Sequence, residues 1–230
     1  MNTDAKDRFD GALVAALSAN GIALCDVQRS QLLRHYELVL DANRLFNLTR
    51  VTVPEDFAVT LHADSLAIVA WSRDRGHCPR RILDIGTGAG IPAVPVAVVR
   101  PDWRVVAVEG TGKKARFVES VAEELGLDNL EIHHSRSELW RDHSGVDAVA
   151  MKAIAPLDRC VALAAPHVRP GGHIVVYKGM SLSDVERANG LEAARKLGLD
   201  SPCQYEYCLV NRHETLRRAL WVYRLSVSRD

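Results

Sequence analysis

The sequence has no excess of either charge. Its 230 residues include 29 Lys or Arg and 29 Asp or Glu, so the formal net charge is zero. Proteins that coat nucleic acid without selectivity carry a strong excess of Lys and Arg. The balance therefore excludes uniform coating of RNA or DNA, but it is compatible with a local basic surface.

Long apolar runs and a cysteine framework are also missing. The longest apolar stretch, residues 91–99, is interrupted by Pro92 and Pro95 and is about half as long as a membrane-spanning helix. The first ten residues are densely charged and lack the layout of a secretory signal. The five cysteines are scattered and form no C-x-x-C pair. These absences predict a cytoplasmic protein without a membrane segment, a disulfide framework or a metal site.

The pattern of apolar residues changes near residue 76. Before this point, residues such as Leu13, Leu17 and Leu32 recur at spacings typical of helices. Asp26 is a plausible N-cap of one helix, and Pro54 suits the first turn of another. We therefore expect residues 1–76 to form a helical cap and residues 77–230 to form a separate core.

Short β-rich runs alternate with helical segments throughout the core. The runs are residues 81–85, 104–109, 130–134, 146–151 and 173–178. This alternation predicts parallel strands joined by helical crossovers, with both faces of the sheet covered. Two further runs, 203–210 and 218–225, are separated by a short polar loop and predict an antiparallel hairpin. The expected fold is α/β and Rossmann-like, with the mostly parallel sheet and C-terminal hairpin of class I methyltransferases, plus the N-terminal helical cap.

A glycine-rich turn follows the first predicted strand. Glycines in this position let the backbone pass close to a nucleotide-like ligand. The spacing is G-x-G-x-G, and Ile91 stands where a dinucleotide fingerprint requires glycine, which favours S-adenosylmethionine over NAD. The predicted cofactor loop consists of Gly86, Thr87, Gly88 and Gly90.

Two acidic residues end the first two predicted strands. Glu109, 23 residues after Gly86, is placed to accept hydrogen bonds from ribose hydroxyls. Asp84 is predicted to make polar contacts at the methionine end of the cofactor, directly or through water. Each feature alone is structural in many α/β proteins, but their order along the chain favours S-adenosylmethionine.

Several motifs outside the glycine loop are shared with one family. They are Asn43 with Asn47-Leu48-Thr49, Asp64-Ser65-Leu66, Gly112-Lys113-Lys114 with Arg116-Phe117, Ser135-Arg136 with Glu138, and Lys178-Gly179. From about Leu24 to Leu225 the chain resembles the bacterial ribosomal small-subunit methyltransferase G family, formerly called glucose-inhibited division protein B. The chain departs from the family pattern in places: the usual Lys-Trp-Asn reads Asp41-Ala42-Asn43, and Leu61 stands where the family has His, with His62 beside it.

The resemblance implies methyl transfer from S-adenosylmethionine to N7 of a guanine in small-subunit (16S) ribosomal RNA. It implies that Gly86 and Ile91 line the cofactor pocket and that Ser137 and Glu138 flank the adenine. Lys152 stands in place of a family Arg near the reaction site, so we predict that it is the catalytic residue. Lys keeps the charge but loses the planar fork of Arg. Guanine N7 already carries a lone pair, so no general base is expected.

Basic residues are concentrated in two places. Residues 100–118 hold five Lys or Arg against two acids, whereas residues 119–131 hold five acids and no Lys or Arg. Cations at a helix N-terminus oppose the helix dipole, which favours a phosphate-binding role. The predicted RNA contacts are Lys113, Lys114 and Arg116, together with Arg217 and Arg218 from a hairpin cluster that also contains Arg212 and His213.

Two other functions are compatible with the same residues. One is a non-catalytic regulator or assembly factor that binds S-adenosylmethionine, and the other is a small-molecule methyltransferase. An enzyme acting on RNA loses activity steeply with salt and prefers ribosomal RNA or a small-subunit particle. A small-molecule enzyme does not, and a non-catalytic binder methylates no RNA. We expect the protein to be a monomer.

Overall fold

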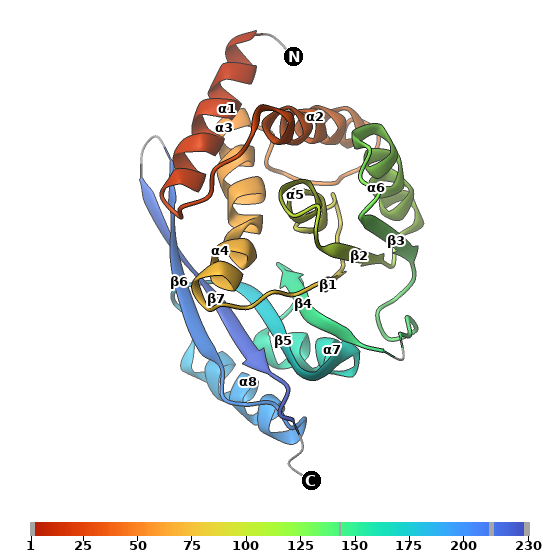
Figure 1. Ribbon diagram of the computed structural model, residues 1–230, viewed down its shortest axis with the longest axis vertical. Helices are drawn as coiled ribbons and strands as arrows, with labels where there is room; N and C mark the ends of the chain where they lie inside the picture. The colour runs from red at the N-terminus through yellow and green to blue at the C-terminus, as the bar shows by residue number, and fades with distance from the viewer. Residues whose placement is uncertain (1–2, 143, 212–213, 228–230) are drawn as a thin grey trace.

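A seven-stranded sheet forms the centre of the computed structural model, which describes residues 3–142, 144–211 and 214–227 (Figure 1). The spatial order is β3-β2-β1-β4-β5-β7-β6. The strands are β1 (Arg81–Ile85), β2 (Arg104–Glu109), β3 (Leu130–His134), β4 (Val146–Lys152), β5 (Val168–Gly179), β6 (Cys203–Val210) and β7 (Thr215–Arg224). Strands β1 to β5 are parallel, and β7 is antiparallel to both β5 and β6. The predicted fold class, including the C-terminal hairpin, is confirmed.

Most strand boundaries match those expected from the β-rich runs. Strands β5 and β7 are longer than predicted, because β5 begins at Val168 and β7 at Thr215. The predicted β5 begins too late in the sequence because Gly171 and Gly172 interrupt its apolar run. In the structure, β4 reaches past this irregular part, with Val146 opposite Val168.

Helices cover both faces of the sheet. On one face α5 (Ala93–Val99) and α6 (Gly112–Leu125) lie with the cap helices, and on the other lie α7 (Leu157–Ala164) and α8 (Asp184–Lys196) (Figure 1). A 3₁₀ turn, η2 (Ala165–His167), joins α7 to β5. Neighbouring strand residues point to opposite faces, so Ile82 packs with the cap and Leu83 packs with α7. Both faces are therefore apolar, as a buried parallel sheet requires.

The predicted N-terminal helices are present. They are α1 (Thr3–Ser18), α2 (Asp26–Asn43), α3 (Pro54–Phe57), the π-helix η1 (Ala58–Ala63) and α4 (Ala67–Asp74). The predicted N-cap is wrong by one residue: Cys25 precedes α2, and its N–H donates to Oε1 of Gln28 at 3.1 Å. Phe9 and Leu13 of the cap belong to the same hydrophobic core as Ile82 of the sheet. A domain boundary at residue 76 stays a prediction.

Candidate functional site

The glycine loop and Glu109 meet at one edge of the sheet. Strands β1 and β2 pair in parallel up to Ile85 opposite Val108, so the segments that follow both strands start at the carboxyl edge of the sheet. The N–H of Gly86 donates to the Val108 carbonyl at 2.7 Å. The N–H of Gly88 donates to Oε2 of Glu109 at 3.0 Å. The predicted cofactor loop and the predicted ribose-binding acid are therefore in direct contact.

Glycine is required by the shape of this loop. Gly86, Gly88 and Gly90 all have positive φ, at 71°, 58° and 83°. A Cβ on Gly90 would lie 2.6 Å from Cγ2 of Val94, which no real Cβ contact allows. After the loop, α5 begins at Ala93, and Pro92 is the residue that precedes the helix.

Asp84 is a buried carboxyl group with unused hydrogen-bonding capacity. It is 1% exposed, and Oδ2 accepts from the N–H of Ala93 at 3.2 Å. Within the described part of the chain, Asp84 Oδ1 accepts no hydrogen bond of normal geometry. Burial raises the pKa of Asp84 to about 7, although the hydroxyl of Thr87 lies near enough to act in the opposite direction and lower it. A buried acceptor of this kind fits a cationic ligand group, such as the ammonium at the amino-acid end of S-adenosylmethionine.

Glu109 holds three loops together at the same edge. Its side chain accepts from Gly88 and, through Oε1, from the N–H of Thr111 at 2.8 Å. Its main-chain carbonyl accepts from the N–H of Ser135 at 3.1 Å, at the start of the loop after β3. A carboxylate has about four acceptor positions, so two remain for ribose hydroxyls.

The two residues predicted to flank the adenine lie in that loop after β3. Ser137 is 8% exposed, and its hydroxyl donates to Oε2 of Glu138 at 3.1 Å, whereas Glu138 is exposed. Both therefore belong to the edge that carries Asp84 and Glu109. Their contact with adenine stays a prediction.

Lys152 ends β4 at the same edge, but its amine points toward the cap. It forms a short ion pair with Asp64 and donates to the Thr60 carbonyl at 3.0 Å. Asp64 also accepts from the hydroxyl of Tyr207, on β6, at 2.5 Å. Burial and the nearby Asp64 carboxylate raise the pKa of Tyr207 well above its usual range, which keeps the phenol protonated as a donor. The catalytic role assigned to Lys152 stays a prediction.

A buried histidine pair, not identified as functional from the sequence, supports the glycine loop. His35 and His62 are fully buried, with His35 Nδ1 3.0 Å from His62 Nε2. His35 Nε2 lies 2.8 Å from the carbonyl oxygen of Ala89, so this nitrogen carries the proton. Burial lowers the pKa of His35 to about 4, which leaves the ring neutral. His62 Nε2 therefore donates to His35 Nδ1, and the cap reaches the cofactor loop through this pair.

The predicted RNA-binding residues flank the same edge. Lys113, Lys114 and Arg116 lie in the first turns of α6, four to seven residues after Glu109. Arg218 lies opposite Gly179 at the carboxyl end of β5, and Arg217 pairs with Glu206 at 2.7 Å. Arg212 and His213, the other members of the hairpin cluster, lie outside the described residues.

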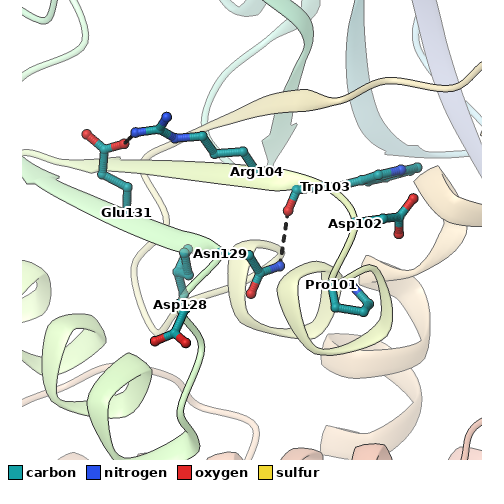
Figure 2. A pocket seen from close by; sticks show the side chains of 8 residues that line it. Pro101, Asp102, Trp103, Arg104, Asp128, Asn129 and Glu131 are labelled. Atoms are coloured by element: carbon teal, nitrogen blue, oxygen red, sulfur yellow. Dashed lines mark hydrogen bonds and ion pairs between the residues drawn. The ribbon is translucent and has the colours of Figure 1, made fainter.

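A separate hollow lies at the amino ends of β2 and β3 (Figure 2). Its volume is about 560 Å³. Its polar groups are largely paired: Arg104 bonds Glu131 at 2.7 Å, and the Asn129 amide donates to three main-chain carbonyls. Because the glycine loop lies at the opposite edge of the sheet, this hollow is not the candidate active site.

The fold and this edge define the class I methyltransferases that depend on S-adenosylmethionine. A structure of M. jannaschii TYW2 in complex with AdoMet is similar, with a TM-score of 0.53 and 12% identity over 64% of this chain and 69% of that chain. A Klebsiella pneumoniae protein solved as a candidate O-methyltransferase has a TM-score of 0.56 and 15% identity, covering 95% of this chain and 96% of that one. These similarities show the fold.

Sequence comparison gives the particular family. The profile of rRNA small subunit methyltransferase G matches residues 28–200. The family member from Solibacter usitatus is 38% identical over 75% of this chain and 81% of its own length, and the one from Leuconostoc citreum is 31% identical over 87% and 85%. The chain therefore belongs to the rRNA small subunit methyltransferase G family, as the motif resemblance predicted. It is a methyltransferase whose cofactor is S-adenosylmethionine.

The described residues contain neither a membrane-crossing helix nor a cluster of metal ligands. No helix in residues 3–142, 144–211 and 214–227 has the length and apolar character needed to cross a membrane. Over the same ranges, no three His, Cys, Asp or Glu side chains are grouped as a metal site would require.

Proposed function

We propose that this chain transfers a methyl group from S-adenosylmethionine to N7 of a guanine in small-subunit (16S) ribosomal RNA. The observation that carries the proposal is family membership over residues 28–200, combined with two carboxyl groups, Asp84 and Glu109, that bracket one glycine loop. Ribosomal RNA or a small-subunit particle is the proposed partner. The monomeric state and the cytoplasmic location remain predictions.

Each residue of the carboxyl edge has a binding or orienting role in this proposal. When bound, S-adenosylmethionine supplies a methyl group activated by a sulfonium. Asp84 would hold the ammonium end and Glu109 the ribose hydroxyls, while Gly86 and Ile91 line the pocket. Ser137 and Glu138 would lie against the adenine. Because guanine N7 presents its lone pair in the base plane, no residue has to remove a proton.

The protein therefore contributes mainly alignment. Effective molarities of about 10⁵ to 10⁸ M for well-oriented groups are large enough for positioning to provide much of the rate. Lys152 would contact the target base or its phosphate from the end of β4, with Asp64 holding its amine before RNA binds. Phosphates along the RNA would bind Lys113, Lys114, Arg116, Arg217 and Arg218 by salt-sensitive contacts.

The test is to map 7-methylguanosine in small-subunit ribosomal RNA from cells with and without this protein. We expect one methylated position to be lost in the deletion strain and restored by the wild-type chain. The Lys152→Ala chain should bind S-adenosylmethionine normally yet restore little methylation. An unchanged methylation map would reject the proposal, and normal methylation by Lys152→Ala would reject the role of that residue.

The purified protein separates the two alternatives. Transfer to ribosomal RNA or particles that falls steeply with added salt supports RNA as substrate. Salt-insensitive transfer to a small acceptor favours the small-molecule enzyme. Cofactor binding without transfer to any RNA favours the non-catalytic binder.

A further inference from the structure

A second hollow lies at the amino edge of the sheet, away from the cofactor loop. Its volume is about 320 Å³, at the lower end of the range for small-molecule sites. It lies where the end of α4, the amino-terminal part of β5 and the end of β7 meet. His173 on β5 is opposite Arg224 on β7 on one side and Ala148 on β4 on the other. Ala148 is in turn opposite Ile82, near the start of β1. The hollow is thus built on the sheet edge opposite to Asp84 and Glu109.

Three rings in mutual contact form one wall of this hollow. The ring centroids of His77 and His173 are 4.4 Å apart, and they lie 4.9 Å and 5.2 Å from that of Trp71. Trp71 is 1% exposed, whereas the two histidines are half-buried. The buried indole therefore fixes two imidazoles that still face the hollow.

Two exposed arginines add positive charge beside this wall. Arg75 and Arg224 both line the hollow, and neither forms an ion pair within the described residues. Burial lowers the pKa of His77, and the charges of Arg224 and Arg75 lower it further. Both guanidinium groups are therefore close enough to act on the same imidazole.

Two acids lie near these arginines. Asp74 pairs with Arg73. Asp200 accepts from the neutral hydroxyl of Ser226, at 2.9 Å, and keeps its negative charge, so two arginines and one aspartate line the hollow. Arg104 in the larger hollow of Figure 2, by contrast, is neutralised by Glu131. Positive charge at the smaller hollow thus exceeds what its surroundings neutralise, a condition that favours an anionic ligand.

We propose that this hollow binds a phosphate group between Arg75 and Arg224, beside His77. Guanidinium groups suit phosphate because their planar fork donates two parallel hydrogen bonds. Under the proposed function, on which this step rests, the phosphate belongs to the ribosomal RNA. The substrate then contacts the sheet at both edges, and the amino edge anchors RNA remote from the methylated base.

Two exposed cysteines provide a direct assay. Cys203 lines the hollow, whereas Cys25 lies before α2 in the cap. The rate of alkylation by iodoacetamide is measured at each cysteine by mass spectrometry, without cofactor, in the presence of a small-subunit RNA fragment, inorganic phosphate or AMP. We expect the RNA to slow labelling of Cys203 several-fold and to leave Cys25 unchanged.

The three ligands distinguish the source of the phosphate. Protection by RNA alone supports the ribosomal anchor. Equal protection by phosphate or AMP supports the same site with a free phosphate or nucleotide as its ligand. No protection by any of them, or equal protection of Cys25 by RNA, would overturn the proposal.

Paired variants separate a built site from general charge attraction. The variant Arg75→Ala/Arg224→Ala should lose the protection of Cys203. Its plot of log affinity for single-stranded RNA against log salt should flatten by about 0.7 per lost phosphate contact. The control is Arg187→Ala/Lys196→Ala, which removes two exposed cations of α8 that pair within their own helix. Equal loss of RNA affinity in both variants would overturn the site.

Failure of the proposed function has a different readout. If RNA protects Cys203 of the wild-type protein but no methyl group is transferred, the proposed function is rejected and the phosphate site is retained. If methyl transfer is normal but RNA does not protect Cys203, the function is retained and the phosphate site is rejected. The double variant should bind S-adenosylmethionine as wild type does, because neither arginine belongs to the carboxyl edge.

Discussion

The two edges of the sheet place charge in opposite ways. At the carboxyl edge, acidic Asp84 and Glu109 are buried beside a glycine loop. At the amino edge, basic Arg75 and Arg224 are exposed beside half-buried histidines. Buried negative charge suits a small cationic ligand that the protein encloses, whereas exposed positive charge suits a polyanion arriving from solution. The zero net charge of the chain is the sum of these separate regions.

The contrast has an energetic consequence. A buried charge depends on its partners inside the fold, so its removal should cost folding stability or cofactor affinity. An exposed charge is screened by water, so its removal should change mainly the binding of RNA. Substitutions at buried and exposed positions therefore test the difference directly, and the largest effect is expected where two buried charges depend on each other.

Lys152→Met should give the largest loss of stability. It leaves the Asp64 carboxylate buried without its cation, and breaking such a pair costs about 3 to 5 kcal/mol. Urea unfolding of the purified protein measures this loss. Lys152→Arg should retain most of the stability because it keeps the charge, and Lys152→Met/Asp64→Asn should recover part of it. Stability equal to wild type in Lys152→Met would remove the energetic contrast between buried and exposed charge.

Asp84→Asn should weaken cofactor binding more than a matched change at the amino edge. Loss of a charge-assisted hydrogen bond costs about 1.5 to 3 kcal/mol, or roughly 10- to 150-fold in affinity. The control is Asp147→Asn, because Asp147 accepts from the N–H groups of Arg80 and Arg81 at the opposite edge. Isothermal titration calorimetry with S-adenosylmethionine should show normal affinity for the control. Equal losses in the two variants would contradict the assignment of the cofactor to one edge.

The strands and the glycine loop were predictable because their causes are local. β1 and β2 consist of short β-rich runs, and the turn from Gly86 to Gly90 needs positive φ at three glycines. Parallel pairing then brings the ends of β1 and β2 to one edge, which the sequence order alone implies. The approximate position of Asp84 beside the loop and Glu109 therefore followed from the chain.

Contacts between distant segments were not predictable in this way. His35 and His62 are 27 residues apart, and Lys152 and Asp64 are 88 apart. Each of these contacts forms only when the cap packs on the sheet. The spacing of residues along the chain does not specify that packing. His62 lies one residue away from the position where the family has His, but no sequence pattern predicts its contact with His35. The hollow at the amino edge likewise requires α4, β5 and β7 to be assembled first.

The histidine pair should make folding stability depend on pH. Burial lowers the pKa of His35 from its ordinary 6.5 to about 4, so the unfolded chain binds more protons between these values. This contribution is therefore fully present above pH 6.5 and is lost as the pH falls toward 4. At pH 5, the stability already lost through His35 is about 2 kcal/mol.

His35→Gln is the test of this dependence, because glutamine can still donate to the Ala89 carbonyl but does not titrate. Urea unfolding at pH 7, 6 and 5 should show a smaller loss of stability for the variant than for wild type. Asp84, whose pKa is raised to about 7, contributes with the opposite sign, but it is present in both proteins and cancels. Parallel pH profiles for the two proteins would show that His35 does not titrate as proposed.

The smallest effect on stability is expected at the exposed pair of Arg217 and Glu206 on the hairpin. Their side chains are 65% and 50% exposed, and such pairs contribute about 0 to 1 kcal/mol. RNA affinity should respond more clearly, and in opposite directions. Arg217→Ala should weaken binding because a phosphate contact is lost, whereas Glu206→Gln should strengthen it because a competing carboxylate is removed. If both substitutions leave RNA affinity unchanged at low salt, Arg217 is a solvated surface residue, and the basic contacts at this edge are confined to Arg218 and the start of α6.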